Sequence, residues 1–143
     1  MILNIVILIF VVLELMNVSI LYFKPDFPHG NSMSAFKGWQ KSQENENTRL
    51  FTNYLVKWVA NCKLIFVVLL LVIVLFGSDT IKVFGIAASI LSIGAYFITL
   101  HPIIKKLDDM GEIRPKGYSK TLALMIAGFM MMFAAGLIIH ILS

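Results

Sequence analysis

The residue most able to do chemistry is Glu14, because it is the only charged side chain in an apolar stretch that runs from Ile2 to Phe23. A charge such as Asp, Lys or Arg at the centre of a membrane-spanning helix costs about 2.5–3.5 kcal/mol on insertion scales, so acids there usually face the bundle interior and are often functional. Asn17 lies one helical turn further along and shares the face of Glu14. A carboxylate beside an amide can relay protons or cations, or can neutralise a charged substrate.

A partner for this acid is found by counting depth along two antiparallel helices. If the first helix starts at Ile2, Glu14 lies about 18 Å from its beginning, at 1.5 Å of rise per residue. Counting back the same distance from Phe76, where the next apolar run ends, reaches Leu64, which adjoins Lys63. We therefore predict that Glu14 and Lys63 form a pair between the first two membrane-spanning helices.

The same count places Asn17 near Asn61, so we expect these two amides beside the Glu14–Lys63 pair. One interpretation of this polar set is a proton or cation relay, or a counter-charge for a substrate. The other is a buried ion pair that only fixes the register of two helices, with Lys63 alternatively extending its amine to the membrane surface. The sequence leaves both interpretations open.

An acidic cluster at Asp108, Asp109 and Glu112 resembles the carboxylate sets that bind divalent cations. Lys105 and Lys106 lie directly beside it, however, and the pattern is that of a solvated helix face. We therefore predict no metal site and no cofactor at this cluster. The chain also has one cysteine, which excludes an intrachain disulfide and a cysteine-rich zinc site.

Small residues recur at helical spacing in two of the apolar segments, and they predict surfaces where helices approach closely. The two segments would then face each other or a second copy of the chain. The residues are Gly85, Ala88, Ser92 and Ala95 in one segment and Gly128 and Ala135 in the other. Three consecutive methionines at 130–132 point in different directions around a helix, so they do not form a copper site.

Helices that cross a membrane are required to position all of these residues. Of the 143 residues, 59% are hydrophobic and only 14% are charged, whereas soluble domains are usually about 45–50% apolar and about 25% charged. Apolar stretches cover Ile2–Phe23, the region ending at Phe76, Val83–Leu100 and Thr121–Leu142. We predict an all-α fold in which residues 1–143 form one domain of four transmembrane helices, arranged as two hairpins.

Two further elements complete the predicted fold. The uncharged run Leu64–Phe76 is too short to span a bilayer, so the second helix must begin near Leu55, and an amphipathic lead-in from Leu50 is expected to merge with it. A tight turn is predicted at Gly77–Thr80. After Pro102, apolar and charged side chains alternate with helical spacing as far as Met110, which is typical of a short helix lying in the membrane interface.

The distribution of basic residues predicts the orientation. Of the 12 Lys and Arg residues, all but Lys82 fall in two segments, 24–63 and 105–120. Lys and Arg are concentrated in cytoplasmic loops. We therefore expect a multi-pass protein of the cell membrane with loops 24–54 and 101–120 cytoplasmic and both termini outside. The same assignment explains the net charge of +4 without nucleic-acid binding.

Three classes of function remain. The first is a non-enzymatic accessory or interaction component that works through helix contacts in the lipid bilayer, as a homo-oligomer or within a larger complex. The second is a small oligomeric transporter or channel in which Glu14 is the coupling or selectivity group. The third is a membrane enzyme acting on a lipid-linked substrate, for which only the acidic cluster at 108–112 is available. No nucleophile motif or phosphate-binding loop is present, so we favour the first class and expect no enzymatic activity.

Overall fold

The computed structural model describes residues 1–28 and 31–143, and its elements there are helices joined by short connections. Residues 29 and 30, within the predicted loop 24–54, lie outside the described residues. In chain order the elements are α1 (Ile2–Phe23), the short 3-10 helix η1 (Met33–Ala35), α2 (Lys37–Ser42), α3 (Glu46–Phe76), α4 (Asp79–Thr99), α5 (His101–Asp109) and α6 (Tyr118–Leu142).

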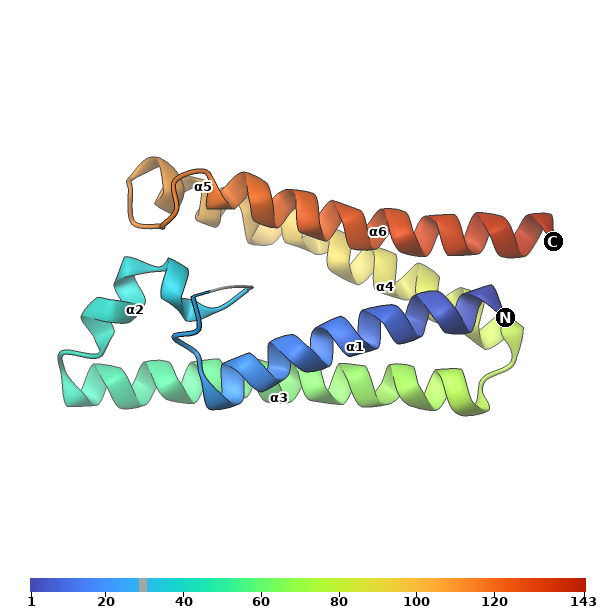
Figure 1. Ribbon diagram of the computed structural model, residues 1–143, viewed down its shortest axis with the longest axis horizontal. Helices are drawn as coiled ribbons and strands as arrows, with labels where there is room; N and C mark the ends of the chain where they lie inside the picture. The colour runs from blue at the N-terminus through green and yellow to red at the C-terminus, as the bar shows by residue number, and fades with distance from the viewer. Residues whose placement is uncertain (29–30) are drawn as a thin grey trace.

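Four helical segments are long and apolar enough to cross a membrane, as predicted: α1, α3, α4 together with α5, and α6. α1 packs along α3, α4 packs along α6, and α1 also contacts α6, so the helices form two antiparallel pairs (Figure 1). Both termini lie at the end that also holds the α3–α4 turn, which we call the turn end. The opposite end, which carries η1, α2, α5 and the connections between them, is called the loop end.

The helix boundaries have local causes. The predicted lead-in from Leu50 and the second long helix form one continuous helix, α3. It begins four residues before Leu50, at Glu46, because Asn45 caps it by accepting a hydrogen bond from the Thr48 N–H. At 31 residues, or about 46 Å, α3 is longer than a bilayer core of about 30 Å. The predicted turn at Gly77–Thr80 is shorter than expected, because Ser78 caps α4 and helix resumes at Asp79.

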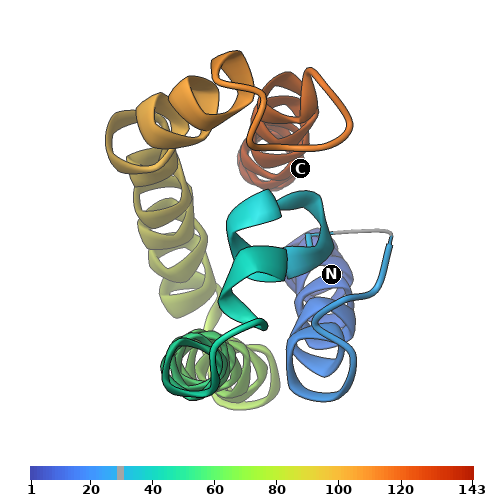
Figure 2. The same ribbon diagram turned by 90° about the vertical axis from the view of Figure 1, so that its left-hand side faces the viewer.

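α5 is separated from α4 at Leu100, just before Pro102. Proline has no N–H to donate to the preceding turn and its ring clashes there, which bends a helix. Figure 2, viewed from the loop end, shows α5 turning from α4 toward α6. The predicted short helix is therefore present, with bounds shifted by one residue.

The main core fills the turn-end half of the bundle. It is built chiefly from α1 and α3, with one residue each from α4 and α6 fully buried between them: Ile86 and Phe133. Phe10 of α1 stands at its centre, with its ring 5.0–6.0 Å from the rings of Phe66, Phe129 and Phe133. A smaller cluster of Leu21, Trp39, Val56 and Ala60 lies at the loop end.

At the loop end the two helix pairs are tied together by backbone hydrogen bonds. Phe36 and Ile113 form an antiparallel bridge, flanked by bonds from the Arg114 N–H to Ala35 (2.8 Å) and from the Lys37 N–H to Glu112 (2.9 Å). These bonds join the connection after α1 to the connection after α5. The loop end is therefore a connected cap over the bundle.

Candidate functional site

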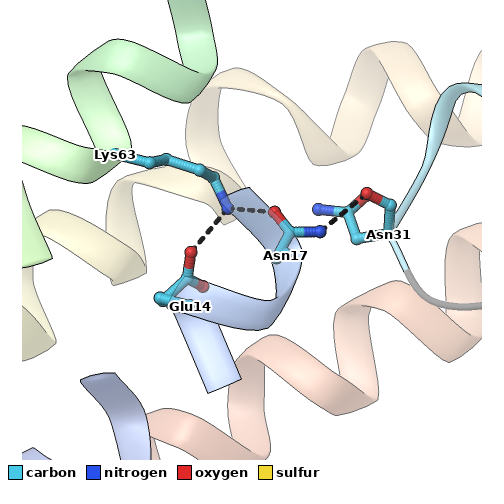
Figure 3. A network of polar contacts seen from close by, with 4 residues as sticks. All are labelled: Glu14, Asn17, Asn31 and Lys63. Carbon is cyan, nitrogen blue, oxygen red and sulfur yellow. Dashed lines mark hydrogen bonds and ion pairs between the residues drawn. The ribbon is translucent and has the colours of Figure 1, made fainter. Parts of the chain in front are cut away.

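The candidate site is built around Lys63, whose amine donates a hydrogen bond to each of two side chains of α1. Lys63 Nζ lies 2.7 Å from Glu14 Oε2 and 2.8 Å from Asn17 Oδ1 (Figure 3). Glu14 and Asn17 share one face of α1, and α1 packs along α3 at this level. The Glu14 side chain is 16% exposed and that of Lys63 is 28% exposed, so the pair is largely shielded by the protein.

Asn17 also connects this pair to the loop end. Its amide nitrogen donates to the backbone carbonyl of Asn31 at 2.8 Å, in the connection that follows α1 (Figure 3). The Asn17 amide oxygen is already used by Lys63, so the amide serves as acceptor and donor at once. The structure thus brings together three of the four predicted polar residues and adds a loop carbonyl that sequence spacing does not reveal.

The fourth residue, Asn61, forms none of these hydrogen bonds. Its side-chain oxygen instead accepts a hydrogen bond from the hydroxyl of Tyr22, nearer the loop end of α1. Residues two apart on an α-helix are rotated by about 200°, so Asn61 and Lys63 point to different sides of α3. A similar position along the helix axis therefore did not imply a shared face.

A cavity of about 420 Å³ opens beside the ion pair, and we call it the central cavity. Glu14 and Lys63 lie on its α1 and α3 walls. Its α4 wall includes Ser92, Ala95 and Thr99, which remain exposed, so the cavity reaches the surface on that side. The core around Phe10 closes it toward the turn end. The arrangement is a half-open chamber with one ion pair in an otherwise mostly apolar lining.

Lys63 borders two smaller cavities as well. One, of about 230 Å³, lies between α1 and α6 and includes Glu14 and Asn17 in its lining. The other, of about 250 Å³, lies between the end of α1 and α3. Lys63 and Asn31 line all three cavities, so the polar network lies between them.

The predicted small-residue surfaces are only partly used inside the chain. Gly85 lies against α3, where an added Cβ would be 3.3 Å from Ile73 Cδ1. Ala88, Ser92, Ala95 and Ala135 are exposed, and an added Cβ on Gly128 would meet nothing within 4 Å. The stripe on α4 therefore turns toward the surface and the central cavity rather than toward α6.

Two further glycines mark close contacts between helices in the described residues. A Cβ added at Gly136 of α6 would lie 2.9 Å from a methyl carbon of Val6 on α1. Gly94 similarly lies against Met130, where α4 meets α6. A glycine in a long apolar helix is a signal for close packing, but the sequence does not say which helix approaches it.

Asp108 differs most from its predicted role. It was expected on a solvated face, but it is buried and binds the start of α6: the N–H of Gly117 donates at 2.9 Å, and the N–H and hydroxyl of Ser119 donate at 3.0 and 2.6 Å. These hydrogen bonds, led by that from the Ser119 hydroxyl, hold the pKa of Asp108 below its ordinary value. Gly117 adopts φ +87°, which a glycine reaches without strain.

The acidic cluster therefore does not present a set of metal-binding carboxylates. Within residues 1–28 and 31–143 no group of three or more His, Cys, Asp or Glu side chains is arranged to hold a metal ion. Cys62 is exposed and Glu112 pairs with Lys41 at 3.2 Å. What the arrangement offers chemically is charge and hydrogen bonding beside an apolar chamber. The chain matches no protein-family model, no curated protein and no solved structure.

Proposed function

We propose that this protein is a non-enzymatic component of the cell membrane that works by binding a transmembrane helix of a partner protein. The partner helix lies on the face where α3 and α4 diverge and covers the open side of the central cavity. The observation that carries this proposal is the exposed stripe of small side chains at Ala88, Ser92 and Ala95 beside that opening.

Small residues favour such an interface for a physical reason. In a bilayer the lipid tails are as apolar as leucine, so helices associate through close packing and hydrogen bonds rather than through the hydrophobic effect. Ala88, Ser92 and Ala95 are spaced by four and three residues, which keeps them on one face of α4. A volume of about 420 Å³ accommodates several large side chains of a neighbouring helix, but not the helix itself.

The orientation proposed for the chain places the loop end in the cytoplasm. It is supported by the distribution of the Lys and Arg residues, which favour the cytoplasmic side. Lys82 lies near the turn end and Lys63 lies inside the bundle, and all the other Lys and Arg residues lie at or near the loop end. Both termini and the α3–α4 turn are then outside the cell. Within this arrangement Glu14 and Lys63 neutralise each other, which supports a structural role for the pair.

The proposal is tested by native mass spectrometry of the tagged full chain extracted gently from its own membrane. We expect a second polypeptide in a fixed ratio, and we expect Ser92→Leu and Ala95→Leu to abolish its retention because the larger side chains hold the helices apart. Ala135→Leu is the matched control, since Ala135 is an exposed small residue on α6 away from the cavity. A chain that is monomeric, or a partner retained equally by all three variants, would overturn the proposal.

A transport function is the second candidate, and one observation favours it: Glu14 and Lys63 both line the central cavity. Because the core closes the cavity toward the turn end, this function requires self-association or a second conformation. A homo-oligomer in the mass spectrum, without another polypeptide, would favour it. Loss of ion or substrate flux in Glu14→Gln, with the oligomer intact, would then identify Glu14 as the coupling group.

A further inference from the structure

A second pocket, separate from the central cavity, lies at the loop end between α5 and the start of α6. Its volume is about 290 Å³. His101 and Lys105 contribute from α5, and Lys116 and Lys120 contribute from the connection and first turn of α6. The proposed partner interface on α4 does not use any of these side chains.

The pocket carries a net positive charge, and its lysines have no ion-pair partner in the part of the chain that the structure describes. Among the described residues, Lys105, Lys116 and Lys120 form no ion pair, although all three line the same concave surface. Two acids, Asp108 and Asp109, also line the pocket, so three lysines against two aspartates leave a formal charge of +1. The Asp108 carboxylate is held by hydrogen bonds from the first turn of α6, which keep it away from the lysine amines. The three lysine ammonium groups can each donate a charge-assisted hydrogen bond to an anion placed among them.

The surroundings of the pocket indicate what kind of anion fits. Ile98 precedes His101 by one helical turn and is 82% exposed, while Leu124 follows Lys120 by one turn and is 73% exposed. Exposed apolar side chains therefore follow the basic pocket on both α4 and α6, toward the part of the helices that would lie in the bilayer, and we call Ile98 and Leu124 the apolar track. A ligand with a phosphate at one end and hydrocarbon at the other matches both features.

We propose that this pocket binds the headgroup phosphate of an anionic phospholipid, with the acyl chains lying along the apolar track. Lys105, Lys116 and Lys120 hold the phosphate by charge-assisted hydrogen bonds, and Ile98 and Leu124 contact the chains. Basic pockets at the cytoplasmic side of transmembrane helices recognise anionic headgroups in this way. The assignment rests on the proposed membrane insertion and orientation, but not on the proposed partner helix.

The test is a lipid titration of the purified full chain, read by native mass spectrometry. Phosphatidylglycerol and phosphatidylcholine with identical acyl chains are added together, and we expect one phosphatidylglycerol to be retained in preference. The variant Lys105→Gln/Lys116→Gln/Lys120→Gln should bind it roughly 100-fold more weakly, since each basic residue near a membrane surface contributes about a factor of five. Far-UV circular dichroism checks that the variant keeps its helix content.

A matched control removes the same charge elsewhere. Lys24→Gln/Arg49→Gln/Lys57→Gln changes three exposed basic residues outside the pocket, so its affinity for phosphatidylglycerol should stay within about twofold of the parent, as expected for side chains without a specific contact. Equal losses in the two variants, or no preference over phosphatidylcholine, would overturn the proposal. Complete displacement of the lipid by excess inorganic phosphate would also overturn it, because a free anion would then be the ligand. Failure of the chain to enter lipid nanodiscs would instead count against the membrane insertion on which both proposals rest.

Discussion

The amine of Lys63 lies 2.7 Å from a carboxylate oxygen of Glu14, and this contact joins α3 to α1 where the packed core gives way to cavities. Toward the turn end the helices are held by the main apolar core, and toward the loop end by hydrogen bonds together with the smaller apolar cluster around Trp39. The ion pair lies at the boundary between these two parts of the bundle. The role of the ion pair can therefore be tested by measuring the stability of the fold as well as by measuring activity.

Removing one member of the pair should destabilise the chain, because it leaves the other charge shielded from water without a counter-charge. For Glu14→Gln we expect a loss of roughly 3 kcal/mol, near the low end for breaking a buried ion pair since both groups keep some exposure. The measurement is reversible unfolding in mixed micelles of detergent and sodium dodecyl sulfate.

The double variant Glu14→Gln/Lys63→Met serves as the control for this prediction. It removes both charges and should recover most of the lost stability, because neutral side chains of similar length carry no desolvation penalty. Equal stability of the single and double variants would contradict a stabilising pair. It would then favour a functional role for Glu14 in which its charge faces water in the cavity.

Gly136 is expected to tolerate no larger side chain, because Val6 approaches it too closely. Gly136→Ala places a Cβ 2.9 Å from a Val6 methyl carbon, and a β-branched valine has little freedom to rotate away. Gly128→Ala, where the added atom meets nothing within 4 Å, is the matched control. Each Gly-to-Ala change gains up to about 1 kcal/mol of helix propensity, and this gain is the same in the two variants. The difference between their unfolding free energies therefore measures overpacking at Gly136, for which we expect about 1–3 kcal/mol. Equal stabilities would mean that α1 and α6 are not in contact there.

Asp108 should contribute to stability by holding the start of α6, whereas its neighbour Asp109 should not. Asp108→Ala removes the acceptor for the N–H groups of Gly117 and Ser119 and should lower the melting temperature by several degrees. Asp109→Ala removes the same charge from an exposed position and should leave it nearly unchanged. The comparison is made by thermal circular dichroism in detergent at neutral pH.

The contribution of Asp108 to the stability of the fold should decrease as the pH is lowered. Its pKa is lower in the folded chain than the ordinary value of about 3.9, so folding favours the ionised carboxylate. The stabilisation is therefore fully present above about pH 4 and is lost as the pH falls through the lowered folded pKa. The melting-temperature gap between the parent chain and Asp108→Ala should be constant from neutral pH to about pH 5 and should shrink below about pH 4. If the difference in melting temperature grew at acid pH, the pKa of Asp108 would be raised by folding instead of lowered.

The proposed orientation predicts which positions are reached from outside the cell. In a Cys62→Ser background, Thr80→Cys in the first turn of α4 should react with a membrane-impermeant maleimide in intact cells. Glu44→Cys, in the connection before α3, should react only after the membrane is permeabilised. The reverse pattern would place the loop end outside and would leave the basic residues on the wrong side for the lipid site proposed above.

The helices themselves could be predicted because their causes are local. α1 has the predicted bounds, and α4 and α6 start only a few residues before the predicted runs, since apolar composition and length decide whether a segment can be a long helix. Depth counting also placed Lys63 level with Glu14, because rise per residue is the same in every α-helix. The count did not reveal that Asn61 accepts a hydrogen bond from Tyr22, because the direction in which a side chain leaves its helix does not follow from depth.

The sequence by itself determined four long apolar helices, the uneven distribution of basic residues and the presence of one acid in an apolar segment. Only the tertiary structure decided that Asn17 bonds to a loop carbonyl, that Gly136 meets Val6, and that Asp108 faces α6 instead of water. The physical reason is that helix formation depends on neighbours within a few residues. The contacts between helix faces depend on how the four helices and their connections pack together. The composition of a single segment does not determine those contacts.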